Sequence, residues 1–136
     1  MFKNPSLDEI RDLLRTVKTV AVVGYSPKPE RAGHYVAAAL QRNGYRIIPV
    51  RPGISEGLGE PAYARLIDLP EAPDLVDVFR EPGAVDAIVD DCIALGVKRL
   101  WLQDGVINEA AAMRAQAAGI TVVMDRCTLR DQGLLT

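Results

Sequence analysis

Continuous apolar runs recur along the chain, and each ends at a glycine or a polar residue. The first covers residues 19–24 and is rich in β-branched side chains with no polar alternation. Such continuous apolarity is typical of a strand buried on both faces, as in a parallel sheet. Four further, mainly apolar runs follow, at residues 45–50, 75–79, 99–102 and 120–124. The pattern therefore predicts five strands.

Segments with helical periodicity precede and separate these strands. Ser6 and Glu9 form a capping-box pattern, in which each side chain can bond the backbone N–H of the other residue. The apolar residues that follow at helical spacing are Ile10, Leu13, Leu14 and Val17. Three more helices are predicted at residues 33–42, 83–95 and 108–118. The glycines that suit a left-handed residue after these helices are Gly44, Gly96 and Gly119.

Strands that alternate with helices predict a parallel sheet with right-handed crossovers. We expect residues 1–136 to form a single Rossmann-type α/β domain. Its doubly wound, five-stranded parallel sheet is expected in the order 3-2-1-4-5, with helices on both faces. Residues 51–74 depart from this rhythm because they are rich in glycine and proline. They are predicted to form a long ordered loop with one helical turn around residues 63–67.

Composition narrows the class of protein. A chain of 136 residues with 49% hydrophobic and 25% charged residues is ordinary for one soluble globular domain. The formal net charge is -2, so no global field favours nucleic acid, and an anion site has to be built locally.

The cysteines and the N-terminal sequence indicate in which cellular compartment the protein is expected. Cys92 and Cys127 are far apart, which fits neither a disulfide framework nor a CxxC metal site. The chain shows no signal-peptide pattern at its N-terminus. It also has no apolar stretch near the ~20 residues that a membrane span needs. We expect a cytoplasmic protein with no nucleic-acid or membrane partner.

Ligands of open parallel sheets bind at the carboxyl ends of the strands, where the strand order reverses. The loop from Gly24 to Arg31 leads there into a helix N-terminus, whose free N–H groups and dipole suit a phosphate. The dinucleotide motif G-x-G-x-x-G is not met, because Tyr25 and Ser26 follow Gly24. Arg51 stands where an acidic residue would bind a ribose hydroxyl. Since arginine favours phosphate, the ligand is expected to carry an extra phosphate, as NADP and coenzyme A do.

These segments together resemble the small coenzyme A-binding domain family, whose fold also forms the N-terminal domain of the succinyl-CoA synthetase α subunit. The resemblance covers nearly the whole chain, and its strings are Val20-Ala21-Val22-Val23-Gly24, Ile48-Pro49-Val50-Arg51-Pro52, Asp77-Val78-Phe79-Arg80, Trp101-Leu102-Gln103-Asp104-Gly105 and Val123-Met124-Asp125-Arg126-Cys127. It implies a small-molecule partner, coenzyme A or an acyl derivative of it.

The resemblance also implies where the ligand lies. The residues expected along the coenzyme A phosphates are Gly24, Tyr25, Ser26, Pro27, Lys28 and Arg31. Those expected at the adenosine end are Arg51 and Pro52, near the 3′-phosphate and adenine, and Phe79 and Arg80, beside adenine or ribose. Those expected along the pantetheine path are Gln103 and Gly105.

Two positions depart from the family pattern. Family members usually carry asparagine where Arg51 stands. They also tend to carry a Glu-His pair after the cysteine, where this chain reads Thr128-Leu129-Arg130-Asp131-Gln132. Any role of such a histidine is therefore missing here.

Two single residues invite a catalytic interpretation. His34, the only histidine, is either a general base or phosphate contact, or an ordinary helix-face residue. Cys127 is either a nucleophile or a structural thiol, and it has no histidine near it in sequence. We expect the structural role for both residues, and a core position for Cys92.

The aromatic and acidic residues near the strand ends likewise have either a functional or a structural role. Trp101 is expected in the core, while Tyr25 and Phe79 are the better candidates to stack on adenine. The aspartates in or beside the last three strands could perform acid–base chemistry or bind a cation, but we expect structural ion pairs. These aspartates are Asp77, Asp104 and Asp125.

The sequence favours a module that binds, senses or presents coenzyme A, with no catalytic residues and no metal. An NADP-dependent oxidoreductase on the same fold is the alternative, although neither a proton donor nor extra chain to cover a nicotinamide is evident. A third hypothesis is a subunit that serves only as an interaction surface. The sequence does not decide between a protein partner and a homo-oligomer.

Overall fold

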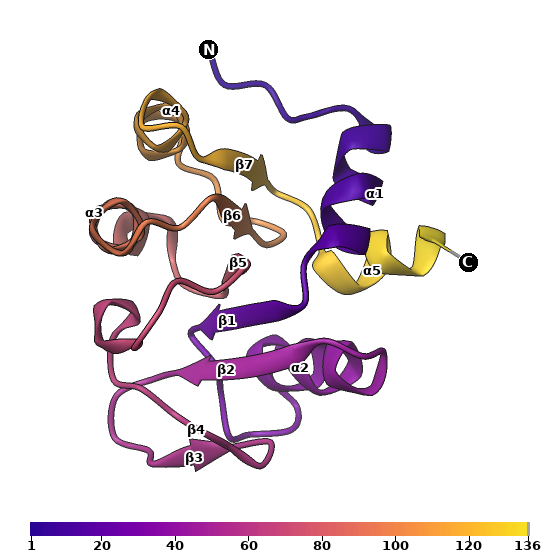
Figure 1. Cartoon of the computed structure of the whole chain (residues 1–136), viewed down its shortest axis with the longest axis vertical. Coiled ribbons are helices and arrows are strands. Elements are labelled where there is room, and N and C mark those ends of the chain that lie inside the picture. The colour runs from indigo at the N-terminus through magenta and orange to yellow at the C-terminus, as the bar shows by residue number, and fades with distance from the viewer. Residues whose placement is uncertain (136) are drawn as a thin grey trace.

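The computed structural model describes residues 1–135, and its centre is a parallel sheet (Figure 1). The five strands are β1 (Thr19–Val23), β2 (Arg46–Val50), β5 (Leu75–Val78), β6 (Arg99–Leu102) and β7 (Thr121–Met124). All neighbouring strands pair in parallel, in the order β2-β1-β5-β6-β7. The predicted doubly wound Rossmann-type α/β fold is confirmed, and each predicted strand matches the observed one to within a residue at either end.

The strand order reverses at β1, as in the expected 3-2-1-4-5 arrangement. Counted along the chain, however, the observed order is 2-1-3-4-5, so β5 lies beside β1 and not at the edge beyond β2. All four residues of β5 are buried, which suits a central position. The edge position beyond β2 holds only a parallel bridge between Val50 and Tyr63.

Helices cover both faces of the sheet (Figure 1). On one face lie α3 (Val85–Leu95) and α4 (Glu109–Ala117), packed with Ala21 and Val23 of β1. On the other lie α1 (Leu7–Thr16) and α2 (Ala32–Arg42), packed with Val20 and Val22. The short helix α5 (Thr128–Gln132), not predicted from the sequence, contacts α1 and α2. Because alternate residues of β1 face the two layers, the strand is apolar from Val20 to Val23.

The predicted helix ends are largely confirmed. The Ser6 hydroxyl accepts from the Glu9 N–H at 3.2 Å, and the Glu9 carboxylate accepts from the Ser6 N–H at 3.1 Å. Gly96 ends α3 with a left-handed φ of 82°. A 3-10 turn, Pro82–Ala84, precedes α3.

The segment between β2 and β5 differs from its prediction. It contains a two-stranded hairpin of β3 (Glu56–Gly57) and β4 (Glu60–Pro61), and a 3-10 turn at Leu66–Asp68. The helical turn therefore lies further along the chain than residues 63–67. Two-residue strands are too short to give an alternating pattern, which is why the sequence does not show the hairpin.

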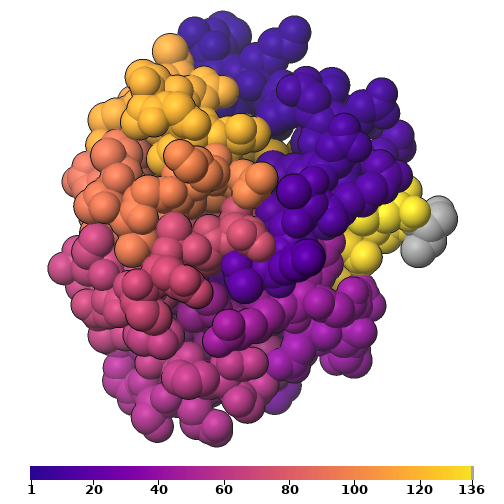
Figure 2. All heavy atoms as spheres, in the orientation of Figure 1, coloured from indigo at the N-terminus to yellow at the C-terminus, as the bar shows by residue number. Residues whose placement is uncertain are grey.

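The N-terminal helix and the C-terminal segment lie side by side. Figure 2 shows the N-terminal helix beside the C-terminal segment, and α1 contacts both α5 and the 3-10 turn Gly133–Leu135. Asn4 pairs with the edge strand β7, donating to the Met124 carbonyl at 2.9 Å and accepting from its N–H at 2.8 Å. Within residues 1–135, no helix has the length and apolar character of a membrane span.

Candidate functional site

Two cavities adjoin at the carboxyl ends of the strands. The first cavity, about 900 Å³, lies between the N-terminus of α2 and the segments that follow β1, β5, β6 and β7. The second cavity, about 790 Å³, lies between the segment after β2 and the N-terminal half of α3. Both are lined by Gly24, Arg51, Arg80 and Glu81. We call the two cavities together the groove; it straddles β1 and β5, where the strand order reverses.

The turn from β1 into α2 depends on two glycines. Gly24 has a φ of +90°, and a Cβ atom there would overlap the Phe79 carbonyl oxygen. A Cβ atom on Gly33 would overlap the Gly24 carbonyl oxygen in turn. These glycines let the α2 N-terminus approach the strand ends, the role glycines have in dinucleotide-binding folds, at a spacing that the standard motif does not cover. The sequence reasoning missed Gly33; a glycine just inside the predicted helix was the available signal.

Basic side chains gather around the first cavity, and two of them, Arg51 and Arg80, also line the second. Lys28 and Arg31 come from the loop before α2, Arg51 follows β2, and Arg80 follows β5. Arg80 is paired with Glu81 at 2.9 Å. Within residues 1–135, the other three form no ion pair with a carboxylate. A chain of net charge -2 thus concentrates positive charge locally at this end of the sheet.

The loop from β1 to α2 is ordered by its own hydrogen bonds. The Ser26 hydroxyl accepts from the Lys28 N–H at 3.1 Å, and the Ser26 carbonyl lies 2.9 Å from His34 Nδ1. Arg51 Nη1 donates to the Tyr25 carbonyl at 3.4 Å. His34 thus supports the loop from the helix and is not among the residues lining the two cavities, in accord with a structural role.

The structure brings most predicted site residues together. Those that line the first cavity are Gly24, Ser26, Lys28, Arg31, Arg51, Phe79, Arg80 and Gln103. Tyr25 and Pro52 line only the second cavity. Pro27 and Gly105 line neither, because the Pro27 side chain is exposed and Gly105 turns its N–H toward Asp125 at 2.7 Å.

The expectation that the Tyr25 ring stacks on adenine is wrong. Tyr25 is only 2% exposed, and its ring packs against Gly57 of β3, where a Cβ atom would collide with it. Its hydroxyl lies 3.4 Å from His34 Nδ1. The hairpin of β3 and β4, which the sequence did not reveal, thus helps to cover this ring. Phe79, which is half-buried, stays the aromatic residue available in the first cavity.

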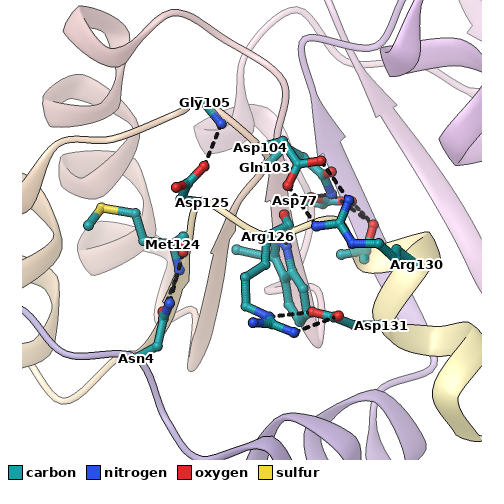
Figure 3. Close-up of polar contacts among 12 residues, drawn as sticks. Asn4, Asp77, Gln103, Asp104, Gly105, Met124, Asp125, Arg126, Arg130 and Asp131 are labelled. Atoms are coloured by element: carbon teal, nitrogen blue, oxygen red, sulfur yellow. Dashed lines mark hydrogen bonds and ion pairs between the residues drawn. The ribbon is translucent and has the colours of Figure 1, made fainter.

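A buried polar cluster lies beneath the first cavity (Figure 3). We call Asp77, Gln103 and Thr128 the Asp77 cluster; all three are buried. Asp77 accepts from Gln103 Nε2 at 2.7 Å and from the Thr128 hydroxyl at 3.0 Å. Burial raises the pKa of the Asp77 carboxyl to about 7, although both hydrogen bonds act in the opposite direction. Sequence reasoning named Asp77 and Gln103 separately and missed Thr128.

Ion pairs flank this cluster (Figure 3). Arg130 holds Asp104 through two hydrogen bonds of 2.8 and 2.9 Å, and both residues line the first cavity. The Arg130 guanidinium lowers the pKa of the Asp104 carboxyl. Of the three aspartates expected in ion pairs, Asp104 alone forms one; Asp77 and Asp125 accept hydrogen bonds from neutral groups. Within residues 1–135, no three acidic, histidine or cysteine side chains form a metal-ligating group.

The other singled-out residues divide between core and cavity. Trp101 and Cys92 are fully buried, as predicted, and burial raises the pKa of the Cys92 thiol to about 12. Cys127 is half-buried, precedes α5 and lines the first cavity. Cys127 thus lies at the candidate site, whereas Cys92 does not.

Residues 18–132 match the family described as CoA binding domain. The chain belongs to this family. It is 38% identical over 125 residues to the uncharacterized protein YneT of Bacillus subtilis, which covers 92% of this chain and 93% of YneT. The fold is shared with a hypothetical protein from Pyrococcus horikoshii, at a TM-score of 0.92 and 33% identity over 99% of this chain and 97% of that one.

The chain is also similar to part of much longer enzymes. It is 25% identical over 120 residues to the ADP-forming acetate–CoA ligase I of Archaeoglobus fulgidus, covering 81% of this chain and 18% of the ligase. The dinucleotide-forming acetyl-coenzyme A synthetase 1 of Ca. Korarchaeum cryptofilum gives a TM-score of 0.70 at 25% identity, over 82% of this chain and 27% of the synthetase. The resemblance to synthetase domains seen in the sequence is confirmed.

Proposed function

We propose that this protein binds coenzyme A, or an acyl derivative of it, in the groove, and that it has no catalytic activity of its own. The observation that carries the proposal is a set of three cations that form no ion pair with a carboxylate of residues 1–135, namely Lys28, Arg31 and Arg51; all three line the first cavity, and Arg51 also lines the second. Coenzyme A carries its phosphates between an adenosine and a pantetheine arm, so a cationic centre with a cavity on either side suits its charge distribution.

In this arrangement, a different part of the groove contacts each part of the ligand. The pyrophosphate lies at the α2 N-terminus, with Ser26, Lys28 and Arg31. The adenosine lies in the second cavity, where Arg51 and Pro52 follow β2. The pantetheine arm runs into the first cavity, past Phe79, Gln103 and Val106, toward Cys127. Phe79 lines only this cavity, so in this arrangement it contacts the pantetheine arm and not the adenine expected from the resemblance. The membership in the CoA binding domain family supports this assignment.

The absence of catalysis is proposed from the side chains around the first cavity. Cys127 is a potential nucleophile there, but the one histidine, His34, bonds to the Ser26 carbonyl and does not line the cavity. Asp104 is engaged by Arg130. A reaction with acyl-coenzyme A would need a nucleophile with a base or a polarising metal, and the lining offers neither pairing.

Parallel calorimetric titrations with coenzyme A, NADP and NAD test the ligand. We expect coenzyme A to bind and to raise the melting temperature, since a ligand that binds only the folded state stabilises it. NAD binding more tightly than coenzyme A would contradict the proposal, and tighter binding of NADP would favour the oxidoreductase alternative. Presentation of coenzyme A to a protein partner, self-association and a cytoplasmic location stay predictions.

A further inference from the structure

Only the nitrogen of the Gln103 side-chain amide is hydrogen-bonded within the described part of the chain. Its nitrogen, Nε2, donates to Asp77 Oδ1 at 2.7 Å and to the Thr128 hydroxyl oxygen at 2.8 Å. The Thr128 hydroxyl in turn donates to Asp77 Oδ2 at 3.0 Å. Both amide hydrogens and the hydroxyl hydrogen are therefore used within the Asp77 cluster.

The other end of the amide is open to the first cavity. Gln103 Oε1 accepts no hydrogen bond from the described part of the chain. Across residues 1–135, the one buried side-chain nitrogen or oxygen without a partner is Arg11 Nε, so Gln103 Oε1 is not shut off from solvent. Because Gln103 lines the first cavity, this oxygen offers an acceptor to whatever lies there.

We propose that Asp77 and Thr128 are positioning residues that fix the Gln103 amide with its oxygen toward the first cavity, so that this cavity selects a ligand arm with an N–H or O–H donor, such as a pantetheine amide. An ionised carboxylate only accepts hydrogen bonds. Rotating the Gln103 amide by 180° would place its oxygen, Oε1, next to the Asp77 oxygens, where two acceptors would face each other without a hydrogen. The ionised Asp77 therefore disfavours the rotated amide. The inference rests on the proposed function, since it names what the first cavity recognises in coenzyme A.

Apart from Gln103 and Thr128, the Asp77 carboxylate is surrounded by apolar residues. In the sheet, Asp77 is level with Val22 of β1 and Trp101 of β6. The helices α1 and α2, which pack on this face, turn only apolar residues and a glycine inward. Thr128 is the neighbour from α5 that bonds to the carboxylate.

The nearby charged residues neutralise one another in pairs. Arg126 holds Asp131 through bonds of 2.7 and 2.8 Å, and Arg130 holds Asp104 through bonds of 2.8 and 2.9 Å. No charged partner is bonded to the Asp77 carboxylate, and burial raises its pKa to about 7. Protonation would let Asp77 donate to Oε1, which turns the amide and presents Nε2 to the cavity.

The experiment compares two ligands, one with and one without the pantetheine arm. Affinities for coenzyme A and for adenosine 3′-phosphate 5′-diphosphate, which lacks that arm, are measured by calorimetry on the wild type, Asp77→Asn and Thr128→Val. Thr128→Ser is the matched control because it keeps the hydroxyl. Thermal unfolding of each variant verifies that it folds, and the shorter ligand reports whether the phosphate site is intact.

We expect Asp77→Asn and Thr128→Val to weaken coenzyme A by about fivefold to tenfold, the effect of one net hydrogen bond. The shorter ligand should change by less than about twofold, and Thr128→Ser should resemble the wild type. Relative to Asp77→Asn, the wild type should gain preference for coenzyme A over the shorter ligand as pH rises through about 7. The terminal phosphate of the shorter ligand ionises in the same pH range, whereas the pyrophosphate of coenzyme A is esterified at both ends, so the two ligands do not titrate alike. This contribution is common to both proteins and cancels when their pH series are compared.

Two results would overturn the inference alone. One is an equal loss for both ligands, which makes the Asp77 cluster merely structural; the other is an unchanged affinity for both ligands in both variants. If Thr128→Val fails to fold, the affinities of Asp77→Asn and the comparison of its pH series with that of the wild type still test the inference. A wild type that binds neither ligand would instead refute the proposed function, and binding of the two with equal affinity would refute only the role of Gln103.

Discussion

Gly33 faces the Gly24 carbonyl oxygen across the turn between β1 and α2, so closely that a Cβ atom on Gly33 would lie 2.5 Å from that oxygen. The contact joins the first turn of α2 to the end of β1, and it brings the helix N-terminus to the place where the cations gather. A side chain at this position has to push the helix away from the loop.

Gly33→Ala should therefore destabilise the protein by about 1–3 kcal/mol, the usual cost of overpacking. Chemical denaturation measures the change. Gly83→Ala is the control, since nothing lies within 4 Å of a Cβ atom there. Equal stability of both variants would mean that the turn relaxes freely, against the close contact described here.

Arg51 should recognise the phosphate that distinguishes coenzyme A from its dephospho form. Arg51→Ala is expected to weaken coenzyme A by about 1.5–3 kcal/mol, the range for a hydrogen bond to a charged group. Dephospho-coenzyme A should lose far less, because it lacks the 3′-phosphate. Arg31→Ala, next to α2, should weaken both ligands alike. If Arg51→Ala reduces both affinities equally, Arg51 does not meet the 3′-phosphate.

The two cysteines should differ in reactivity. Cys127 lines the first cavity, while Cys92 is buried and its pKa is raised to about 12, which leaves almost no thiolate. An alkylating reagent should modify Cys127 in the folded protein, and coenzyme A should slow that reaction. Mass spectrometry on wild type and Cys127→Ser identifies the site. Modification at an unchanged rate with saturating coenzyme A would place the ligand away from Cys127.

Purified protein should neither hydrolyse acyl-coenzyme A nor form it from acid, coenzyme A and nucleotide, because the first cavity has no nucleophile–base pair. Release of free thiol from acyl-coenzyme A measures hydrolysis. Turnover that disappears in Cys127→Ser would contradict the absence of catalysis.

The Asp77 carboxyl should destabilise the folded state as pH rises. Its pKa rises from 3.8 to about 7 on folding, so between these values the folded protein holds a proton that the unfolded chain releases. The free energy of unfolding should then fall with rising pH, by at most about 1.4 kcal/mol per unit, and level off above the folded-state pKa. Denaturation of wild type and Asp77→Asn across this range isolates the effect. A constant difference between the two proteins would show that the pKa is not raised.

The sequence by itself determined the local elements and which residue types follow the strands. Continuous apolar strands, the Ser6–Glu9 cap and the glycines after helices depend on neighbours within a few residues, so their pattern is visible along the chain. Arg51 at the end of β2 was equally readable, since the carboxyl ends of parallel strands share one edge.

Only the tertiary structure decided which side chains meet across segments. The bond between Thr128 and Asp77 joins residues 51 positions apart, and the contact of Gly57 with Tyr25 depends on a hairpin with two-residue strands. Neither leaves a periodic trace, and packing across layers selects such partners by shape and by the need to satisfy buried polar groups. The same reason places β5 beside β1: a strand buried on both faces is stable in the centre of the sheet, whatever its place in the chain.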